Sequence, residues 1–411
     1  MRFNTALLHG DFRGDKKTGA TQTPVYQSSA FEHASAETLE KIFNNKAPGF
    51  SYSRISNPTV DAFERRMTAL EGGIASVSCA SGMAAITNAF TNILRSGDEI
   101  VCSASLYGGS IDLFRDLENF GIKTHYVENN NIEQFEAATN DNTRLYFAET
   151  IGNPRLDVTD IKLLSEAAHK AGVPLIVDNT VATAYLIKPI EYGADIVVNS
   201  TSKYVNGNSN SISGVITDSG NFKWDSVKYP GMKEYAKFGQ YAYTAKLRNG
   251  IYRNTGACLS PQNAFYNILG IETLGLRMER ITDNALKLAE YLDTNYSFLN
   301  VNYPGLKSSE FHAIADKELN NGYGGIITIR TGSKENAFKF INALKLPLNV
   351  SNIGDTKTLV IHPGSTISAH STEEEKKIAG VFDDLVRISV GIEDIEDLIE
   401  DFTQAVEFIQ Q

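Results

Sequence analysis

Short apolar runs alternate with stretches of helical period over residues 99–199 of this 411-residue chain. Each run is continuously apolar, which indicates a strand that is covered on both faces of a sheet. The stretches between them, such as residues 160–171 with apolar side chains on one face, predict helices. Strands that alternate with helices predict a mostly parallel sheet in an α/β fold. The predicted strands are 99–103, 145–149, 174–178 and 195–199.

The pattern divides the chain into three parts. Residues 1–56 show little helical period and predict an extended arm. Residues 57–255 contain the alternating strands and helices and predict a large domain. Residues 256–411 predict a smaller C-terminal α+β domain, because the apolar pattern changes to separate strands followed by a final amphipathic helix.

Local signals support these divisions. Asn57 and Pro58 are typical of a helix start, and Gly72 is typical of its end. Residues 218–255 interrupt the alternation and predict a loop-rich insertion. Residues 385–390 alternate, so that Arg387 shares one strand face with two neighbours.

Composition excludes several classes of protein. Lys and Arg number 38 and Asp and Glu 49, a net charge of −11, which argues against a nucleic-acid or anionic-membrane binder. No run of about 18 apolar residues predicts a membrane span, and the first residues do not form a signal core. We therefore expect a soluble cytoplasmic protein. The three cysteines form no C-x-x-C pair, so neither a disulfide framework nor a metal site is expected.

Polar residues stand just beyond the predicted strands, where ligands bind in open α/β sheets. Tyr107, Asn153, Asp178 and Lys203 each follow or end a different strand. A small-residue turn at residues 80–85 (ASGMAA) leads directly into a helix, a pattern that favours phosphate binding by backbone N–H groups.

These residue types together predict a pyridoxal phosphate (PLP) site. A carboxylate such as Asp178 at the end of an apolar strand needs a partner, which a protonated pyridine nitrogen supplies. A lysine among small polar residues, such as Lys203, can form a Schiff base when its pKa is lowered. A phosphate turn, a carboxylate, an aromatic ring and a lysine are the groups that PLP requires.

At this point the chain resembles the Cys/Met-metabolism PLP-dependent enzymes, from about residue 7 to residue 405. This family includes cystathionine γ-synthase, cystathionine and methionine γ-lyases and O-acetylhomoserine sulfhydrylase. The resemblance implies an aspartate-aminotransferase-like fold of type I and a homotetramer built from two dimers. The matching motifs are 23–29 (TPVYQSS), 52–59 (YSRISNPT), 80–85 (ASGMAA), 107–109 (YGG), 177–180 (VDNT), 200–204 (STSKY) and 386–391 (VRISVG).

The resemblance also implies a role for each matching residue. Lys203 would carry the cofactor and move protons between substrate carbons, with Asp178 at the pyridine nitrogen and Tyr107 stacked on the ring. Arg387 would bind the substrate carboxylate as a two-pronged donor. The other implied cofactor contacts are Gly82, Met83, Ser200 and Ser202 at the phosphate, Asn153 and Thr180 near the ring, and Tyr52 and Arg54 from a neighbouring subunit.

Within the family, the chain most resembles the sulfhydrylases. Residues 352–363, which begin with Asn352, resemble their substrate-binding segment. This implies γ-replacement, in which sulfide or a thiol displaces acetate from O-acetylhomoserine. Three alternatives stay open: a γ-eliminating lyase, a cystathionine γ-synthase, and a non-catalytic protein with the same fold. Departures from the family pattern at Asn208, Asn210 and Ser368 flank the expected site.

Overall fold

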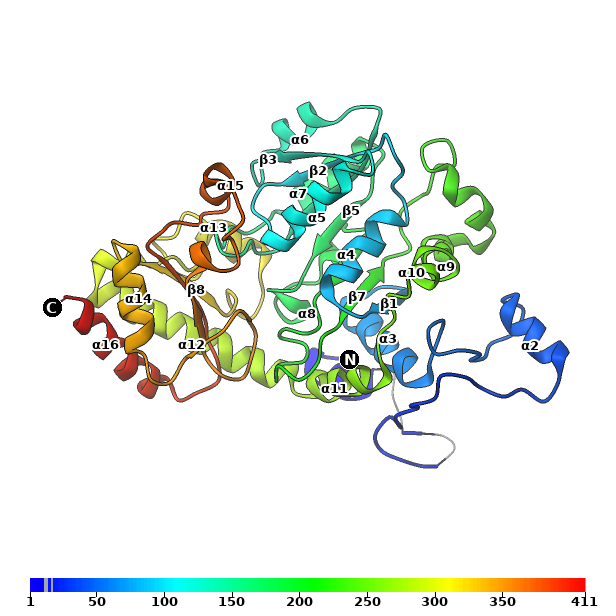
Figure 1. The fold of residues 1–411 in the computed structure, drawn as a ribbon, viewed down its shortest axis with the longest axis horizontal. Helices are drawn as coiled ribbons and strands as arrows, with labels where there is room; N and C mark the ends of the chain where they lie inside the picture. The colour runs from blue at the N-terminus through cyan, green and yellow to red at the C-terminus, as the bar shows by residue number, and fades with distance from the viewer. Residues whose placement is uncertain (11–13, 16–17, 411) are drawn as a thin grey trace.

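The computed structural model describes residues 1–10, 14–15 and 18–410 (Figure 1). Residues 11–13 and 16–17 of the predicted arm, and residue 411 of the predicted C-terminal domain, lie outside the described residues. No helix among the described residues is long and apolar enough to cross a membrane.

A seven-stranded sheet forms the centre of the larger part of the chain. Its strand order is β1-β7-β6-β5-β4-β2-β3, and only β7 runs antiparallel to its neighbours. The mostly parallel sheet predicted from the apolar runs is therefore confirmed. The strands are β1 (Ala75–Cys79), β2 (Glu99–Ser103), β3 (Lys123–Val127), β4 (Thr143–Glu149), β5 (Leu175–Asp178), β6 (Ile196–Asn199) and β7 (Gly214–Asp218).

Helices cover both faces of this sheet, which explains the continuous apolar runs. Successive strand residues point to opposite faces, so Tyr146 belongs to one core and Phe147 to the other. The helix predicted after Asn57 is α3 (Pro58–Glu71); the Asn57 side chain accepts from the Thr59 N–H, and Gly72 ends the helix in the left-handed conformation. The remaining helices around this sheet are α4 (Gly82–Thr91), α5 (Gly108–Glu118), α6 (Ile132–Ala138), α7 (Ile161–Lys170) and α8 (Thr183–Leu186).

A four-stranded sheet with its own core forms the smaller part. Its order is β8-β11-β10-β9, and the last pair is parallel. Helices pack on it, with Phe340 and Phe402 in ring contact at 5.8 Å between centroids. The elements are β8 (Ile326–Arg330), β9 (Leu348–Asn349), β10 (Leu359–Ile361), β11 (Leu385–Ser389), α12 (Leu274–Asn295), α13 (His312–Glu318), α14 (Lys334–Ala343), α15 (Glu373–Ile378) and α16 (Ile395–Gln410).

The packing bears on the predicted domain boundary at residue 256. Helix α11 (Pro261–Glu272) packs against α3 of the large part, and the side chains of α12 up to Ile281 belong to the same core. From Ala285 onward, the side chains of α12 belong to the core of the small sheet. We therefore propose a boundary inside α12, about one helix later than the apolar pattern placed it.

Two predicted irregular segments contain helices. In the insertion at 218–255, η2 (Pro230–Tyr241), α9 (Ala242–Asn249) and α10 (Ile251–Thr255) form beside aromatic packing in which Trp224 stacks on Tyr243 at 5.4 Å. The loop-rich prediction was wrong here, because aromatic contacts between distant residues leave no helical period in the sequence.

The predicted arm also contains two helices, α1 (Phe3–His9) and α2 (Ala36–Phe43). Leu7 of α1 is buried in the core of the large part. By contrast, α2 buries none of its side chains and projects from the body of the molecule (Figure 1).

Asp218, the last residue of β7, generates a prediction about pH and stability. Its side chain is 3% exposed, Oδ1 accepts from the Gly220 N–H at 2.9 Å, and Oδ2 has no hydrogen-bond partner among the described residues. Burial raises the pKa of this carboxyl to about 7. The folded chain therefore holds the proton more tightly than the unfolded chain. As a result, the free energy of unfolding decreases as pH rises from about 4 to about 7.

Asp218→Asn cannot ionise, so its stability relative to the parent chain should rise by about 2–3 kcal/mol between about pH 5 and about pH 8. Thermal unfolding at both pH values measures this difference. The exposed Asp116→Asn controls for the loss of one charge. An equal pH dependence of all three chains would show that Asp218 stays ionised in the folded protein.

Candidate active site

A cavity of about 410 Å³ lies at the carboxyl ends of β4, β5 and β6. Parallel strands present these ends at one edge of the sheet, which is why ligands bind there. The cavity brings together most of the site residues predicted from the sequence. Those that line it are Gly82, Met83, Tyr107, Asn153, Asp178, Thr180, Ser200, Ser202, Lys203, Asn352 and Arg387.

Lys203 follows β6 and is partly buried in the cavity wall. Its backbone N–H bonds to the Ser200 carbonyl at 3.1 Å, and its Nζ donates to Asn352 Oδ1 at 2.6 Å. Burial first, and then the nearby Arg387 charge, lower the pKa of this amine to about 8. A substantial fraction of neutral amine at physiological pH makes Lys203 a capable nucleophile and base.

Asp178 is the last residue of β5, and it lies in register with a second acid, Glu149, at the end of β4. Thr180 donates to Asp178 Oδ1 from its N–H at 2.9 Å and from its hydroxyl at 2.5 Å. Burial raises the Asp178 pKa to about 6, although the Thr180 bonds oppose this rise. The carboxylate is therefore largely ionised at neutral pH and can hold a protonated ring nitrogen.

Glu149 is a site residue that the sequence reasoning missed. It ends β4 in register with Asp178, lines the cavity and is buried. Burial first, and then the Asp178 charge, raises the pKa of Glu149 well above its ordinary value. Glu149 Oε1 accepts from the Tyr107 N–H at 2.6 Å, so this acid fixes the backbone where α5 begins. The sequence signal that could have identified Glu149 is its position as an acidic residue at the end of the apolar run 145–149.

The small-residue turn is packed too closely for larger side chains. Ser81 caps α4 by accepting from the Ala84 N–H at 3.0 Å. A Cβ atom at Gly82 would lie 2.6 Å from the Cβ of Ser200, so only glycine fits. The first N–H groups of α4, those of Gly82 and Met83, have no acceptor within the helix. With Ser202 they form a site suited to phosphate.

Arg387 reaches the cavity from β11 of the small sheet and is only 3% exposed. Its Nη1 donates to Asn153 Oδ1 and its Nη2 to the Asn352 carbonyl, both at 3.1 Å. Its Nε is buried and has no hydrogen-bond partner in the part of the chain that the structure describes. Burial lowers the Arg387 pKa to about 10, so the side chain stays charged at neutral pH. A buried, charged donor without an acceptor fits a carboxylate ligand.

Tyr52 and Arg54 do not line this cavity. Tyr52 is 42% exposed, and the Arg54 guanidinium lies 5.5 Å from the centre of its ring. Arg54 Nη1 donates to the Arg253 carbonyl. Their implied contact with a neighbouring subunit stays a prediction.

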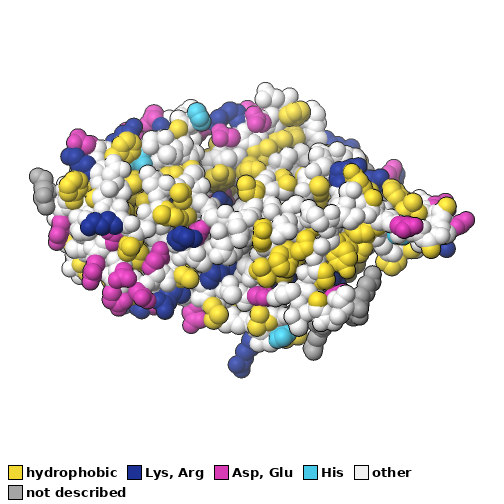
Figure 2. Space-filling view, turned by 60° about the horizontal axis from the view of Figure 1, so that its bottom comes forward, with side chains coloured by type: hydrophobic (Ala, Val, Ile, Leu, Met, Phe, Trp, Pro, Cys, Tyr) yellow, Lys and Arg dark blue, Asp and Glu magenta, His cyan; other side chains and the backbone are white. Residues whose placement is uncertain are grey.

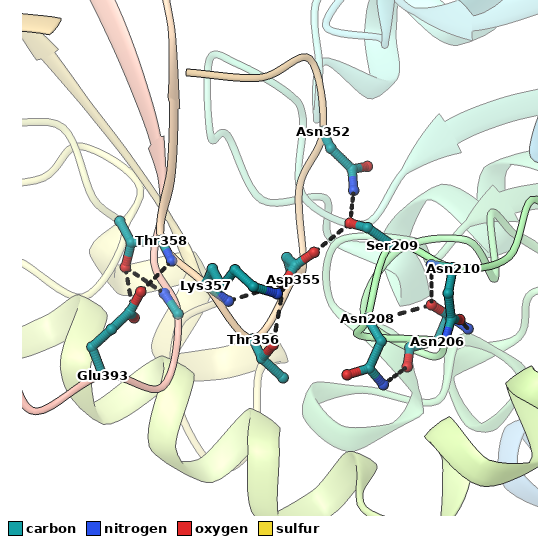
Figure 3. A network of polar contacts seen from close by, with 11 residues as sticks. Asn206, Asn208, Ser209, Asn210, Asn352, Asp355, Thr356, Lys357, Thr358 and Glu393 are labelled. Carbon is teal, nitrogen blue, oxygen red and sulfur yellow. Dashed lines mark hydrogen bonds and ion pairs between the residues drawn. The ribbon is translucent and has the colours of Figure 1, made fainter. Parts of the chain in front are cut away.

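Two of the residues that depart from the family pattern form side-chain hydrogen bonds within the loop after Lys203 (Figure 3). Asn208 Nδ2 donates to the Asn206 carbonyl at 3.1 Å, and Asn210 Oδ1 accepts from Asn206 Nδ2 at 2.8 Å. Ser368 is buried beside the cavity segment, while its neighbour Ile367 lines the cavity itself. Other lining residues that the sequence did not indicate are Ile151, Val181, Ser211, Ile212, Ser351 and Ile367, while Ser81, Ile86, Ser209 and Ile353 lie in or beside the motifs described above.

The residues present fit PLP on structural grounds. The Gly82 turn leaves no room for a side chain, Asp178 offers a partly buried carboxylate, and Lys203 offers an amine with a lowered pKa. Arg387 adds an unpartnered donor for the carboxylate of an amino-acid substrate.

Comparisons with known proteins agree with this geometry. A family model described as Cys/Met metabolism PLP-dependent enzyme matches residues 4–407. The O-acetyl-L-homoserine sulfhydrylase of Corynebacterium glutamicum is 43% identical, and the match covers 97% of this chain and 95% of that protein. The homocysteine synthase of Schizosaccharomyces pombe is 40% identical, with 98% of each chain covered.

A solved structure extends the likeness to the fold. A Campylobacter jejuni protein provisionally named O-acetylhomoserine (thiol)-lyase, which contains N'-pyridoxyl-lysine-5'-monophosphate, has a TM-score of 0.96 and 32% identity. The match covers 99% of this chain and 100% of that chain. The resemblance and the type I fold expected from the motifs are thereby confirmed. This chain belongs to the Cys/Met-metabolism family of PLP-dependent enzymes.

Proposed function

We propose that this chain catalyses γ-replacement on O-acetylhomoserine, in which sulfide or a thiol displaces acetate and gives homocysteine or a thioether. One observation carries the proposal: the Lys203 amine shares a cavity with Asp178, Arg387 and the Gly82 turn. The sulfhydrylase and homocysteine synthase relatives support this choice of substrate, at 43% and 40% identity over nearly the whole chain. Among the solved structures, the protein provisionally named O-acetylhomoserine (thiol)-lyase has a TM-score of 0.96, against 0.87 for the cystathionine γ-lyase of Lactobacillus plantarum.

The site residues have separate tasks in this proposal. PLP, when bound, withdraws electrons from the substrate and makes its carbon-bound protons removable. Lys203 Nζ would take these protons and return them, since its pKa of about 8 leaves both protonation states accessible. Asp178 would hold the pyridine nitrogen, and Tyr107 would cover the ring. Arg387 would bind the substrate carboxylate and so fix the carbon chain beside Lys203.

We also infer that the active form contains more than one copy of the chain. Tyr52 and Arg54 lie outside their own cavity, which supports their predicted role in a neighbouring subunit. Leu269 on α11 and Leu276 on α12 are exposed at 40% and 66%, and apolar side chains gather on the face seen in Figure 2. Large exposed apolar areas are typical of protein interfaces. The homotetramer and the cytoplasmic location stay predictions.

The reaction itself gives the first test. With O-acetylhomoserine and sulfide, the PLP-loaded chain should release homocysteine and acetate in equal amounts, as measured by chromatography. Lys203→Ala should lower the rate by about 10³-fold, because the proton-transfer group is lost. Lys287→Ala, at an exposed position on α12, is the matched control. Ketobutyrate and ammonia formed without any thiol would show elimination instead.

The second test concerns the substrate carboxylate. Arg387→Lys keeps the charge but loses the planar fork, so kcat/KM for O-acetylhomoserine should fall by about 10–100-fold, mainly through KM. Arg330→Lys, on the neighbouring strand β8 and paired with Asp384, should leave KM unchanged. Equal KM values for both variants would exclude Arg387 from carboxylate binding.

The third test asks whether Arg54 acts across an interface. Arg54→Ala should bind PLP about tenfold more weakly, as equilibrium dialysis measures, because one phosphate contact is lost. Mixed by co-expression with Lys203→Ala, it should regain about one quarter of the parental activity at limiting PLP, since half of random dimers are hybrids with one intact site. No recovery in the mixture would place Arg54 in its own chain's site, and unchanged PLP binding would refute its role.

A further inference from the structure

A chain of polar contacts connects Lys203 to the buried acid Asp355, and Figure 3 shows its part from Asn352 through Ser209 to Asp355. Lys203 Nζ donates to Asn352 Oδ1 at 2.6 Å, and Asn352 Nδ2 donates to Ser209 Oγ at 2.9 Å. The Ser209 hydroxyl in turn donates to Asp355 Oδ2. Asp355 is only 4% exposed, and Ser209 has a φ of 52°, in the left-handed region. The mechanism proposed above uses neither Ser209 nor Asp355.

The direction of each hydrogen bond follows from the charge on Asp355. Burial raises the pKa of Asp355, but the bonds from Ser209 and Lys357 outweigh it, so the pKa lies below its ordinary value. An ionised carboxylate only accepts hydrogen bonds, so the single hydroxyl hydrogen of Ser209 is committed to it. Ser209 Oγ can then only accept from Asn352. The amide NH₂ group of Asn352 therefore faces Ser209, and its oxygen faces Lys203.

We propose that Asp355 is a positioning residue that acts through Ser209 to keep the carbonyl oxygen of the Asn352 amide facing Nζ of Lys203. The inference rests on the proposed function, in which Lys203 is the proton-transfer group. An acceptor at Nζ favours the ammonium form of Lys203. The charged or titratable groups that share the cavity with Lys203 are Arg387, Asp178, Glu149 and Tyr107.

Asp355→Asn should reverse the direction of the whole chain of hydrogen bonds. Asp355 Oδ1 already accepts from Lys357 N at 3.0 Å and from Thr356 Oγ1 at 3.1 Å, so an oxygen must remain on that side. The new NH₂ group would then donate to Ser209 Oγ. The Ser209 hydrogen would turn to residue 352, whose amide must flip and present its NH₂ group to Lys203.

The NH₂ group of residue 352 would then face the Lys203 ammonium, which places one hydrogen-bond donor against another. This arrangement disfavours the ammonium form of Lys203. We therefore expect Asp355→Asn to lower the pKa of the Lys203 amine by about one unit, a tenfold change in the ratio of amine to ammonium. Competitive acetylation of the full-length chain before PLP is added, quantified at Lys203 by mass spectrometry over a pH series, measures this value. The pH profile of kcat in the PLP-loaded enzyme should move in the same direction.

Two further variants separate this directional effect from simple loss of a contact. Ser209→Ala leaves the Asn352 amide free to follow Lys203, so the fall in pKa should be smaller than in Asp355→Asn. Adding Ser209→Ala to Asp355→Asn should restore the Lys203 pKa toward that of Ser209→Ala alone. Lys357→Met removes an exposed amine 3.3 Å from Asp355 but keeps the backbone bond, and should have little effect.

Two results would count against the role of Asp355. An unchanged Lys203 pKa in folded Asp355→Asn, or no restoration in the double variant, would overturn it. If Asp355→Asn does not fold, Asp355→Ala frees the Ser209 hydrogen without supplying a donor. The Lys203 pKa should then fall by more than in Ser209→Ala, and an equal or smaller fall would overturn the proposal. Lack of turnover by the parent chain with O-acetylhomoserine would count against the proposed function and leave the labelling result readable.

Discussion

The parallel pairing of β4, β5 and β6 is the constraint on which the site depends. It sets Glu149 opposite Asp178 and Asp178 opposite Val198, so that these strands end at one edge. Because side chains alternate, the residues one position further on face away from the cavity. There Thr150 donates to Asn179 at 2.9 Å, and Asn199 donates to the buried Glu71 at 2.8 Å. These buried hydrogen bonds thus link the ends of the strands on the side that faces away from the cavity.

Desolvation assigns different charges to groups that share one cavity. It raises the pKa of both acids, Asp178 to about 6 and Glu149 well above its ordinary value, and it lowers that of Lys203 to about 8. Arg387 falls only to about 10. At neutral pH the site therefore holds a charged arginine, a carboxylate at Asp178 and a lysine close to its titration point. Such separated pKa values are what acid–base chemistry at neutral pH requires.

Local signals predicted the strand ends and the polar residues that follow them, and the family resemblance supplied further residues; together these are half of the residues that line the cavity. Apolar runs, a small-residue turn and a capped helix are each readable within about ten residues. Glu149 was missed because its importance comes from strand register, which brings it beside Asp178. The contact between Ser209 and Asp355 was not predicted, because it joins residues 146 positions apart. The arm residues Tyr52 and Arg54 carry a motif, but a single chain has no partner surface on which to place them.

Asn352 joins the two parts of the molecule at the point where the substrate would enter. Its side chain accepts from Lys203, which follows strand β6 of the large sheet, while its backbone carbonyl accepts from Arg387 on the small sheet. Nη2 of Arg387 carries two hydrogens, so it can hold this carbonyl and still share a substrate carboxylate with Nε, which has no partner among the described residues. The arginine that would bind the substrate carboxylate therefore also holds the backbone of residue 352, whose side chain contacts Lys203. One residue connects the predicted carboxylate-binding side chain with the predicted proton-transfer group.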